Sequence, residues 1–144
     1  MEKDIYEITE RFNNLIPSHE LDLIVLKGHL LVEEILEDIL NHFWKNNKYI
    51  KNCNLVFFKK LCISASLVPE FPPSLYDAVK LLNEVRNSLA HKLEPQNYEE
   101  KIDRLIGMFE KGMCFVSEVN KELKLKSAIA IICANLVFVR DKLN

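Results

Sequence analysis

The sequence predicts an all-α fold, in which residues 1–144 form a single helical bundle of about five to six helices. Of its 144 residues 49% are hydrophobic, whereas only three are Gly and five are Pro. This composition favours long helices over a turn-rich sheet. Apolar residues recur every three or four positions, which is the period of one helix face. No repeat, low-complexity tract or linker divides the chain, so we expect one domain.

The first two helices are predicted on either side of Pro17. Residues 4–16 carry apolar side chains at helical spacing, and Pro17 ends this helix. Ser18 is a suitable N-cap for a second helix that continues to Trp44. The buried stripe of the second helix is expected to consist of Leu23, Leu26, Leu30, Leu31, Ile35, Ile39 and Phe43.

A segment rich in lysine and aromatic residues follows. Residues 41–60 contain five lysines and no acidic residue. Aromatic faces can stack on bases while lysines contact phosphates, so this segment is a candidate RNA-binding surface. The alternative is a loop whose aromatic side chains belong to the core, followed by a third helix that begins at Asn54 and buries Phe58. The candidate RNA-binding residues are Trp44, Lys45, Lys48, Tyr49 and Lys51.

Capping and proline signals divide the second half of the chain. Ser74 and Asp77 have the spacing of a capping box and predict the start of a fourth helix. Pro95 is expected to end that helix. A fifth, amphipathic helix is expected to begin near Asn97 and to reach about Leu123.

The last predicted helix, 128–143, is apolar nearly all round, so we expect it to be central or covered by a partner subunit. The apolar run 127–139 is shorter than the roughly 20 residues that span a bilayer. The charged start of the chain does not resemble a signal peptide. We therefore expect a soluble, cytoplasmic protein with no membrane contact.

The charge balance and the cysteines restrict the function. Lys and Arg number 19 against 21 Asp and Glu, a formal charge of −2, so any site for a polyanion must be local. Cys53, Cys62, Cys114 and Cys133 stand far apart in apolar surroundings. We expect them to be buried, reduced thiols rather than a disulfide framework.

The run 82–91, Leu-Asn-Glu-Val-Arg-Asn-Ser-Leu-Ala-His, carries the candidate catalytic residues. Arg86, Asn87 and His91 lie off the apolar stripe of the fourth helix. That stripe consists of Leu75, Val79, Leu82, Val85 and Leu89. An arginine can clamp a phosphate and a histidine can transfer a proton near neutral pH. The alternative is that both side chains only complement the helix dipole. No metal-ligand spacing or glycine-rich phosphate loop occurs, so no metal and no cofactor are predicted.

Acidic residues line one side of the second helix. Glu33 and Glu34 lie there, and His29 is four positions before Glu33. In one interpretation this is a solvated acidic face. In the other, Glu33, Glu34 or His29 reaches across the bundle and orients Arg86 or His91.

The 82–91 run resembles the signature of the HEPN superfamily (higher eukaryotes and prokaryotes nucleotide-binding). In that signature an Arg is followed by a polar residue, usually Asn, and a few positions later by His. The form Arg-Asn-x-x-Ala-His is typical of the branch that resembles the mannitol-operon repressor. The order of helices over residues 18–125 is also similar to that of the superfamily.

This resemblance implies a helical bundle that homodimerises and brings two Arg/His motifs into one cleft. It implies metal-independent endoribonuclease activity in bacterial toxin–antitoxin or anti-phage defence systems. Arg86 and His91 would then be the catalytic pair and Asn87 the assisting polar residue. RNA would be the substrate, and an antitoxin or regulatory protein would be a further partner.

One position departs from this pattern, and one alternative function remains. In the toxin branch that pairs with a nucleotidyltransferase antitoxin, a Tyr follows the His by two residues, but Leu93 stands there in this chain. Neutralisation by modification of that Tyr is therefore not expected. The alternative function is a non-catalytic, dimeric regulatory module similar to a transcriptional repressor.

Overall fold

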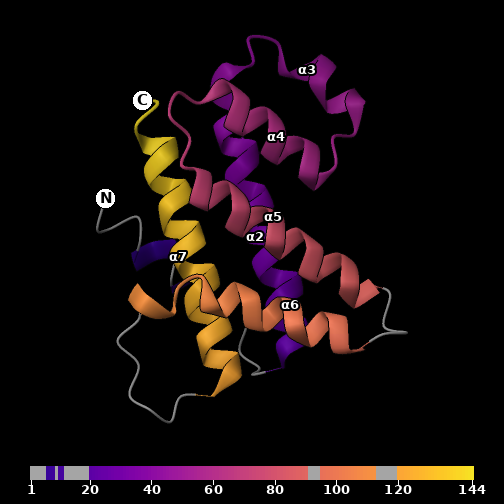
Figure 1. Ribbon diagram of the computed structural model, residues 1–144. Coiled ribbons are helices and arrows are strands. Elements are labelled where there is room, and N and C mark those ends of the chain that lie inside the picture. Colours follow the sequence, from indigo (N-terminus) through magenta and orange to yellow (C-terminus); the bar gives the residue numbers. More distant parts are fainter. Residues whose placement is uncertain (1–5, 9, 12–19, 91–94, 113–119) are drawn as a thin grey trace.

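The computed structural model describes residues 6–8, 10–11, 20–90, 95–112 and 120–144. Within these ranges the chain is helical and contains no strand, which confirms the all-α prediction (Figure 1). Five of the α-helices in these ranges have 11 or more residues, as expected for the bundle. The elements are α2 (Leu21–Phe43), α3 (Asn47–Ile50), η1 (Lys51–Cys53), α4 (Phe57–Leu67), α5 (Pro73–Ala90), α6 (Pro95–Gly107), η2 (Glu110–Gly112) and α7 (Lys121–Asp141).

Helix α2 is the element around which the others pack. Helix α7 lies along it and makes the most extensive helix–helix contact in the described part of the chain. Helices α4 and α5 also pack on α2, and α6 packs on α5 and α7 (Figure 1). Buried side chains from α2, α4, α5, α6 and α7 form one contiguous hydrophobic cluster.

Two leucines of α2 face solvent, contrary to the predicted stripe. Leu26 is 40% exposed and Leu30 is 63% exposed, whereas Val25, Val32 and Leu36 are fully buried. The reason is that α7 covers one side of α2 while α4 and α5 cover others, so the buried arc is set by three neighbours. Leu26 and Leu30, four residues apart, share the arc that these neighbours leave open.

Two predicted helix starts are wrong. Helix α2 begins at Leu21 with Glu20 as its N-cap, whereas Ser18, the predicted N-cap, lies outside the described residues. Asn54 does not open α4, because its left-handed backbone (φ 48°) ends η1, and α4 begins at Phe57. This later start turns Phe57 inward, whereas Phe58, expected in the core, is 39% exposed.

Both proline-led helices start at the proline itself. Helix α5 begins at Pro73, which places Ser74 in the first turn and Asp77 just beyond it, so the two do not form a capping box. Helix α6 begins at Pro95, before the expected start at Asn97. Proline suits the first helical position because its missing N–H would have no intrahelical acceptor there.

The predicted fifth helix is divided in two. Helix α6 ends at Gly107, and Leu123 belongs to α7. Helix α7 starts at Lys121 because the Asn120 side chain caps it, accepting a hydrogen bond of 2.9 Å from the Leu123 amide. Its buried side chains pack within the chain's own bundle, mainly against α2, whereas Leu123 and Phe138 stay exposed.

The cysteines differ from one another in burial. Cys133 is fully buried in α7, Cys62 is half-buried and Cys53 is exposed. The expectation of a buried thiol is therefore wrong for Cys53, which the short η1 turn holds at the surface. Cys114 lies outside the described residues.

In the described ranges, no helix has both the length and the apolar composition needed to cross a membrane.

Candidate functional site

A cleft of about 520 Å³ opens between α2, α4 and α5, and we call it the Arg86 cleft. It brings two of the predicted catalytic residues, Arg86 and Asn87, together with two of the orienting candidates, His29 and Glu33. Both Arg86 and Asn87 are exposed to solvent. The residues that line the cleft are His29, Glu33, Leu55, Val56, Phe57, Phe58, Asn83, Arg86 and Asn87.

The periodicity of α5 turns its polar residues into this cleft. Leu82 and Val85 are fully buried and fix the face that α5 presents to the core. Asn83 is three residues before Arg86 and four before Asn87, so the three side chains share another face. The polar side chains at these positions therefore all line the Arg86 cleft.

His29 forms the inner wall of the cleft and is only 7% exposed. Its ring stacks on Phe57 with the centroids 3.9 Å apart. Its Nε2 lies 3.1 Å from Oδ1 of Asn83. Because an amide oxygen only accepts, Nε2 carries the proton and donates in this contact.

Burial lowers the pKa of His29, and the nearby Arg86 cation acts in the same direction. The hydrogen bond to Asn83 and the charge of Glu33 oppose this shift but do not cancel it. The imidazole is therefore neutral at pH 7, since its ordinary pKa is already about 6.5.

Glu33 is paired with a lysine rather than with Arg86. Lys60 Nζ donates to Glu33 Oε1 at 2.8 Å and to Glu37 Oε1 at 2.6 Å. Burial acts to lower the pKa of Lys60, but its hydrogen bonds to the two carboxylates raise it overall. This ion triad joins α4 to α2 at the edge of the cleft.

The other predicted site residues fall in different places. Glu34 points away from the cleft and binds Arg11, with two hydrogen bonds of 2.9 and 2.8 Å. Arg86 is exposed and lines the cleft. His91 directly follows Ala90, the last residue of α5, and lies outside the described residues.

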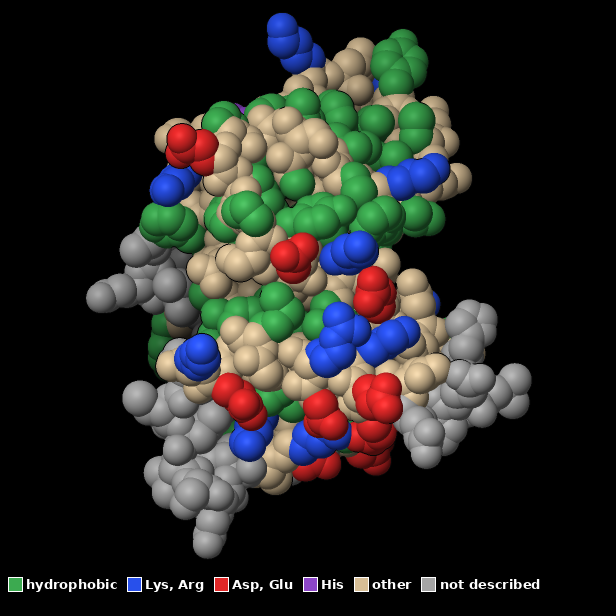
Figure 2. Space-filling view, in the orientation of Figure 1, with side chains coloured by type: hydrophobic (Ala, Val, Ile, Leu, Met, Phe, Trp, Pro, Cys, Tyr) green, Lys and Arg blue, Asp and Glu red, His purple; other side chains and the backbone are tan. Residues whose placement is uncertain are grey.

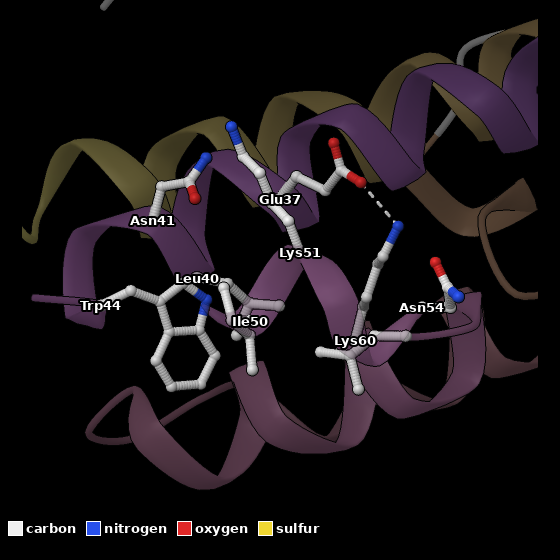
Figure 3. A pocket seen from close by; sticks show the side chains of 9 residues that line it. Glu37, Leu40, Asn41, Trp44, Ile50, Lys51, Asn54 and Lys60 are labelled. Carbon is white, nitrogen blue, oxygen red and sulfur yellow. Dashed lines mark hydrogen bonds and ion pairs between the residues drawn. The ribbon is translucent and has the colours of Figure 1, made fainter. Parts of the chain in front are cut away.

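A second hollow of about 290 Å³, which we call the Trp44 pocket, lies farther along α2. It contains two of the candidate RNA-binding residues, Trp44 and Lys51, near the Glu37–Lys60 ion pair (Figure 3). Lys45, Lys48 and Tyr49 are exposed but do not line it. The lining consists of Glu37, Leu40, Asn41, Trp44, Ile50, Lys51, Asn54, Leu55 and Lys60.

Figure 2 shows how side chains of different kinds gather on one face of the molecule. Hydrophobic side chains are concentrated over α3 and α4, where Tyr49, Val56, Phe58 and Leu67 are among the exposed residues. Acidic and basic side chains alternate over α6.

The sequence patterns did not single out Asn83 as a site residue, and they marked Phe57 only as one aromatic residue of segment 41–60, not as the partner of a histidine. Asn83 is a polar residue next to a buried leucine and one turn before Arg86, and this position is a usable signal. Phe57 carries no comparable signal, because its partner His29 is 28 positions away in the sequence.

No group of three or more His, Cys, Asp or Glu side chains among the described residues is arranged to hold a metal ion. Comparisons of the chain with protein-family models, with curated proteins and with solved structures find no significant match. The fold and the site thus define an all-α bundle with a polar cleft between α2, α4 and α5.

Proposed function

We propose that this protein is a metal-independent endoribonuclease of the HEPN type and acts as the toxic effector of a bacterial toxin–antitoxin or anti-phage system. The observation that supports the proposal is that Arg86 and Asn87 open onto one cleft with Asn83 and a neutral His29. A cation, amide groups and an imidazole around one opening suit a phosphodiester.

In the proposed reaction the 2′-hydroxyl of RNA attacks the adjacent phosphorus. A base removes the hydroxyl proton, the bond from phosphorus to the 5′-oxygen breaks, and that oxygen takes up a proton. The products are a 2′,3′-cyclic phosphate and a 5′-hydroxyl. Arg86 stabilises the charge that develops on the phosphoryl oxygens, and His91 transfers the proton.

The buried polar pair supports this chemistry indirectly. His29 occupies Oδ1 of Asn83, so the Asn83 amide N–H groups are left to donate to a phosphate oxygen. Because His29 is neutral, it adds no charge next to Arg86. We assign His29 and Asn83 as positioning residues for the substrate.

A second copy of the chain would complete the site. Arg86 and His91 are five positions apart, which is about 140° of rotation on an ideal helix, so convergence of the two needs either a loosened last turn or a second copy of the motif. In a homodimer with two copies of the motif in one cleft, Arg86 of one copy can act together with His91 of the other. The exposed apolar side chains of Leu26 and Leu30 on α2 provide a surface for such an association.

The test is RNA cleavage by the purified full chain in EDTA. We expect products that end in 2′,3′-cyclic phosphate, and a loss of about 100-fold or more in rate for Arg86→Ala and for His91→Ala. Arg104→Ala, which removes an exposed arginine of α6, is the control and should keep the rate. A requirement for a divalent metal, or full activity of both variants, would refute the proposal.

The second candidate function is a non-catalytic regulatory module that self-associates. The observation that favours it is the apolar rim of the cleft, where Val56 is 59% and Phe58 is 39% exposed. It predicts a dimer that Phe58→Glu disrupts, together with no RNA cleavage at any protein concentration. Cleavage that is lost on Arg86→Ala would exclude this candidate.

A further inference from the structure

We propose that the Trp44 pocket binds one base of the single-stranded RNA whose phosphate lies in the Arg86 cleft. This inference rests on the proposed function and adds a base-binding subsite to it. It starts from the observation that two hollows of different chemistry lie next to each other along α2, both bordered by Leu55.

The walls of the Trp44 pocket suit a flat, polar ring. Figure 3 shows the indole of Trp44 beside Leu40 and Ile50 at one end of the pocket, with Asn54 at the other. Aromatic and aliphatic side chains can sandwich a base, while amide groups can bond to its edge. A volume of about 290 Å³ is near the lower limit for small-molecule sites, so it suits one base with its sugar rather than a larger ligand.

The backbone at Asn54 helps to hold this shape. Asn54 adopts a left-handed conformation with φ of 48° between η1 and α4. Asparagine adopts this left-handed conformation more readily than other non-glycine residues, so it suits the tight turn between η1 and α4. Here the turn brings the Asn54 side chain to the pocket wall, opposite Asn41 of α2.

An ion triad lies between the pocket and the cleft. Lys60 bonds to Glu33, which lines the cleft, and to Glu37, which lines the pocket. His29 and Glu37 are eight residues apart on α2, which corresponds to roughly 12 Å along the helix axis. A short RNA strand can therefore occupy both hollows at once.

The charges favour a strand over an isolated neutral ring. The charge of Lys60 is compensated by its two carboxylate partners. Lys51 is exposed and makes no ion pair with any residue that the structure describes, so it can meet a phosphate at the pocket mouth. Phosphate contacts by lysine add affinity that falls as salt increases.

Trp44 is the only tryptophan of the chain, so its fluorescence reports on the pocket directly. We would titrate the full chain with a 2′-O-methyl RNA oligonucleotide, which cannot be cleaved because its 2′-oxygen is blocked. We expect quenching of Trp44 fluorescence by the single strand and no quenching by a duplex of the same sequence. The mononucleotide should need at least tenfold higher concentrations for the same quenching.

Two variants test the walls separately, with binding followed by anisotropy of a labelled oligonucleotide. Trp44→Leu should weaken binding about 10- to 100-fold, the range for loss of one stacked base. Lys51→Glu alters only an exposed side chain, so it should leave the fold intact and weaken binding most at low salt. Lys111→Glu, the same change on exposed η2, is the control and should bind like the wild type.

The outcomes separate this inference from the proposed nuclease. RNA cleavage with unchanged Trp44 fluorescence and normal binding by Lys51→Glu would overturn the base pocket and leave the nuclease standing. Quenching by the single strand without any cleavage of unmodified RNA would overturn the nuclease and support the pocket. Equal quenching by the mononucleotide and the strand would overturn the assignment of the pocket to an RNA strand.

Discussion

His29 and Arg86 line the same cleft but differ in exposure, and this difference sets their roles. Arg86 is exposed, so its guanidinium is available to an anion. His29 is buried between Phe57 and Asn83, and its burial disfavours the protonated ring. The neutral His29 makes the stability of the fold depend on pH.

We expect the free energy of unfolding to fall as the pH drops below about 6.5, the ordinary pKa of histidine in an unfolded chain. The unfolded chain takes up a proton at His29 there, whereas the folded chain resists it because its pKa is lowered. Above that pH the contribution of His29 is fully present. His29→Gln should therefore reduce the loss of stability between pH 7.5 and pH 5.5, as measured by urea denaturation.

The control for this measurement is His42→Gln, which changes an exposed histidine of the same helix. It should leave the pH dependence as in the wild type. If His29→Gln and the wild type lose the same stability on acidification, burial of His29 does not act on its protonation as inferred.

The cysteines should react at very different rates with a thiol reagent. Burial raises the pKa of Cys133 to about 12, so almost no thiolate forms at pH 8, and the side chain is also inaccessible. Cys53 is exposed in η1. Mass spectrometry after brief alkylation should find Cys53 modified and Cys133 intact, and modification of Cys133 in the folded protein would contradict its place in the core.

At the scale of helices, the contact between α2 and α4 depends on the cation of Lys60. The side chain of Lys60 is 12% exposed and bonds to Glu33 and Glu37. These carboxylates are four residues apart on α2 and repel each other when the lysine is removed. Lys60 therefore acts as a tie between two helices that border both the cleft and the pocket.

Lys60→Met should lower the free energy of unfolding by about 1–2 kcal/mol, between the values for exposed and buried ion pairs. Lys59→Met changes the exposed neighbour and should cost no more than about 0.5 kcal/mol. Urea denaturation of both variants at one salt concentration is the measurement. Equal stabilities would mean that the triad does not tie α4 to α2.

One contiguous hydrophobic core stabilises the described part of the molecule. A substitution at one core position should therefore lower the stability of the whole fold. Leu136 is fully buried in α7, the helix that packs most extensively on α2. Trp44 lies at the end of α2 and is not part of the hydrophobic cluster. In a cooperative fold these two distant positions nevertheless unfold together.

Leu136→Ala should lower the free energy of unfolding by about 2–5 kcal/mol, the range for large-to-small changes in a core. The midpoints from circular dichroism and from Trp44 fluorescence should shift together. Leu123→Ala on the same helix is the matched control, because Leu123 is 46% exposed and its loss should cost less than about 1 kcal/mol. A shift in only one of the two signals would show that the core is not cooperative.

Much of the fold follows from local periodicity. The spacing of Leu75, Val79, Leu82 and Val85 predicted α5, its buried face and the outward position of Arg86 and Asn87, and the structure agrees at each of these residues. The helix starts were predicted less well. Whether proline, asparagine or serine begins a helix depends on backbone geometry at one residue, as the left-handed Asn54 shows.

The sequence by itself determined that this chain is helical and that α5 presents Arg86 and Asn87 away from its buried face, because both properties depend on residues a few positions apart. The tertiary structure decided that His29 pairs with Asn83, 54 positions away, and that Glu33 and Glu37 hold Lys60. It also decided that Leu26 and Leu30 stay exposed. The physical reason is that side chains distant in sequence meet only after the helices pack, and periodicity within one helix carries no information about its neighbours.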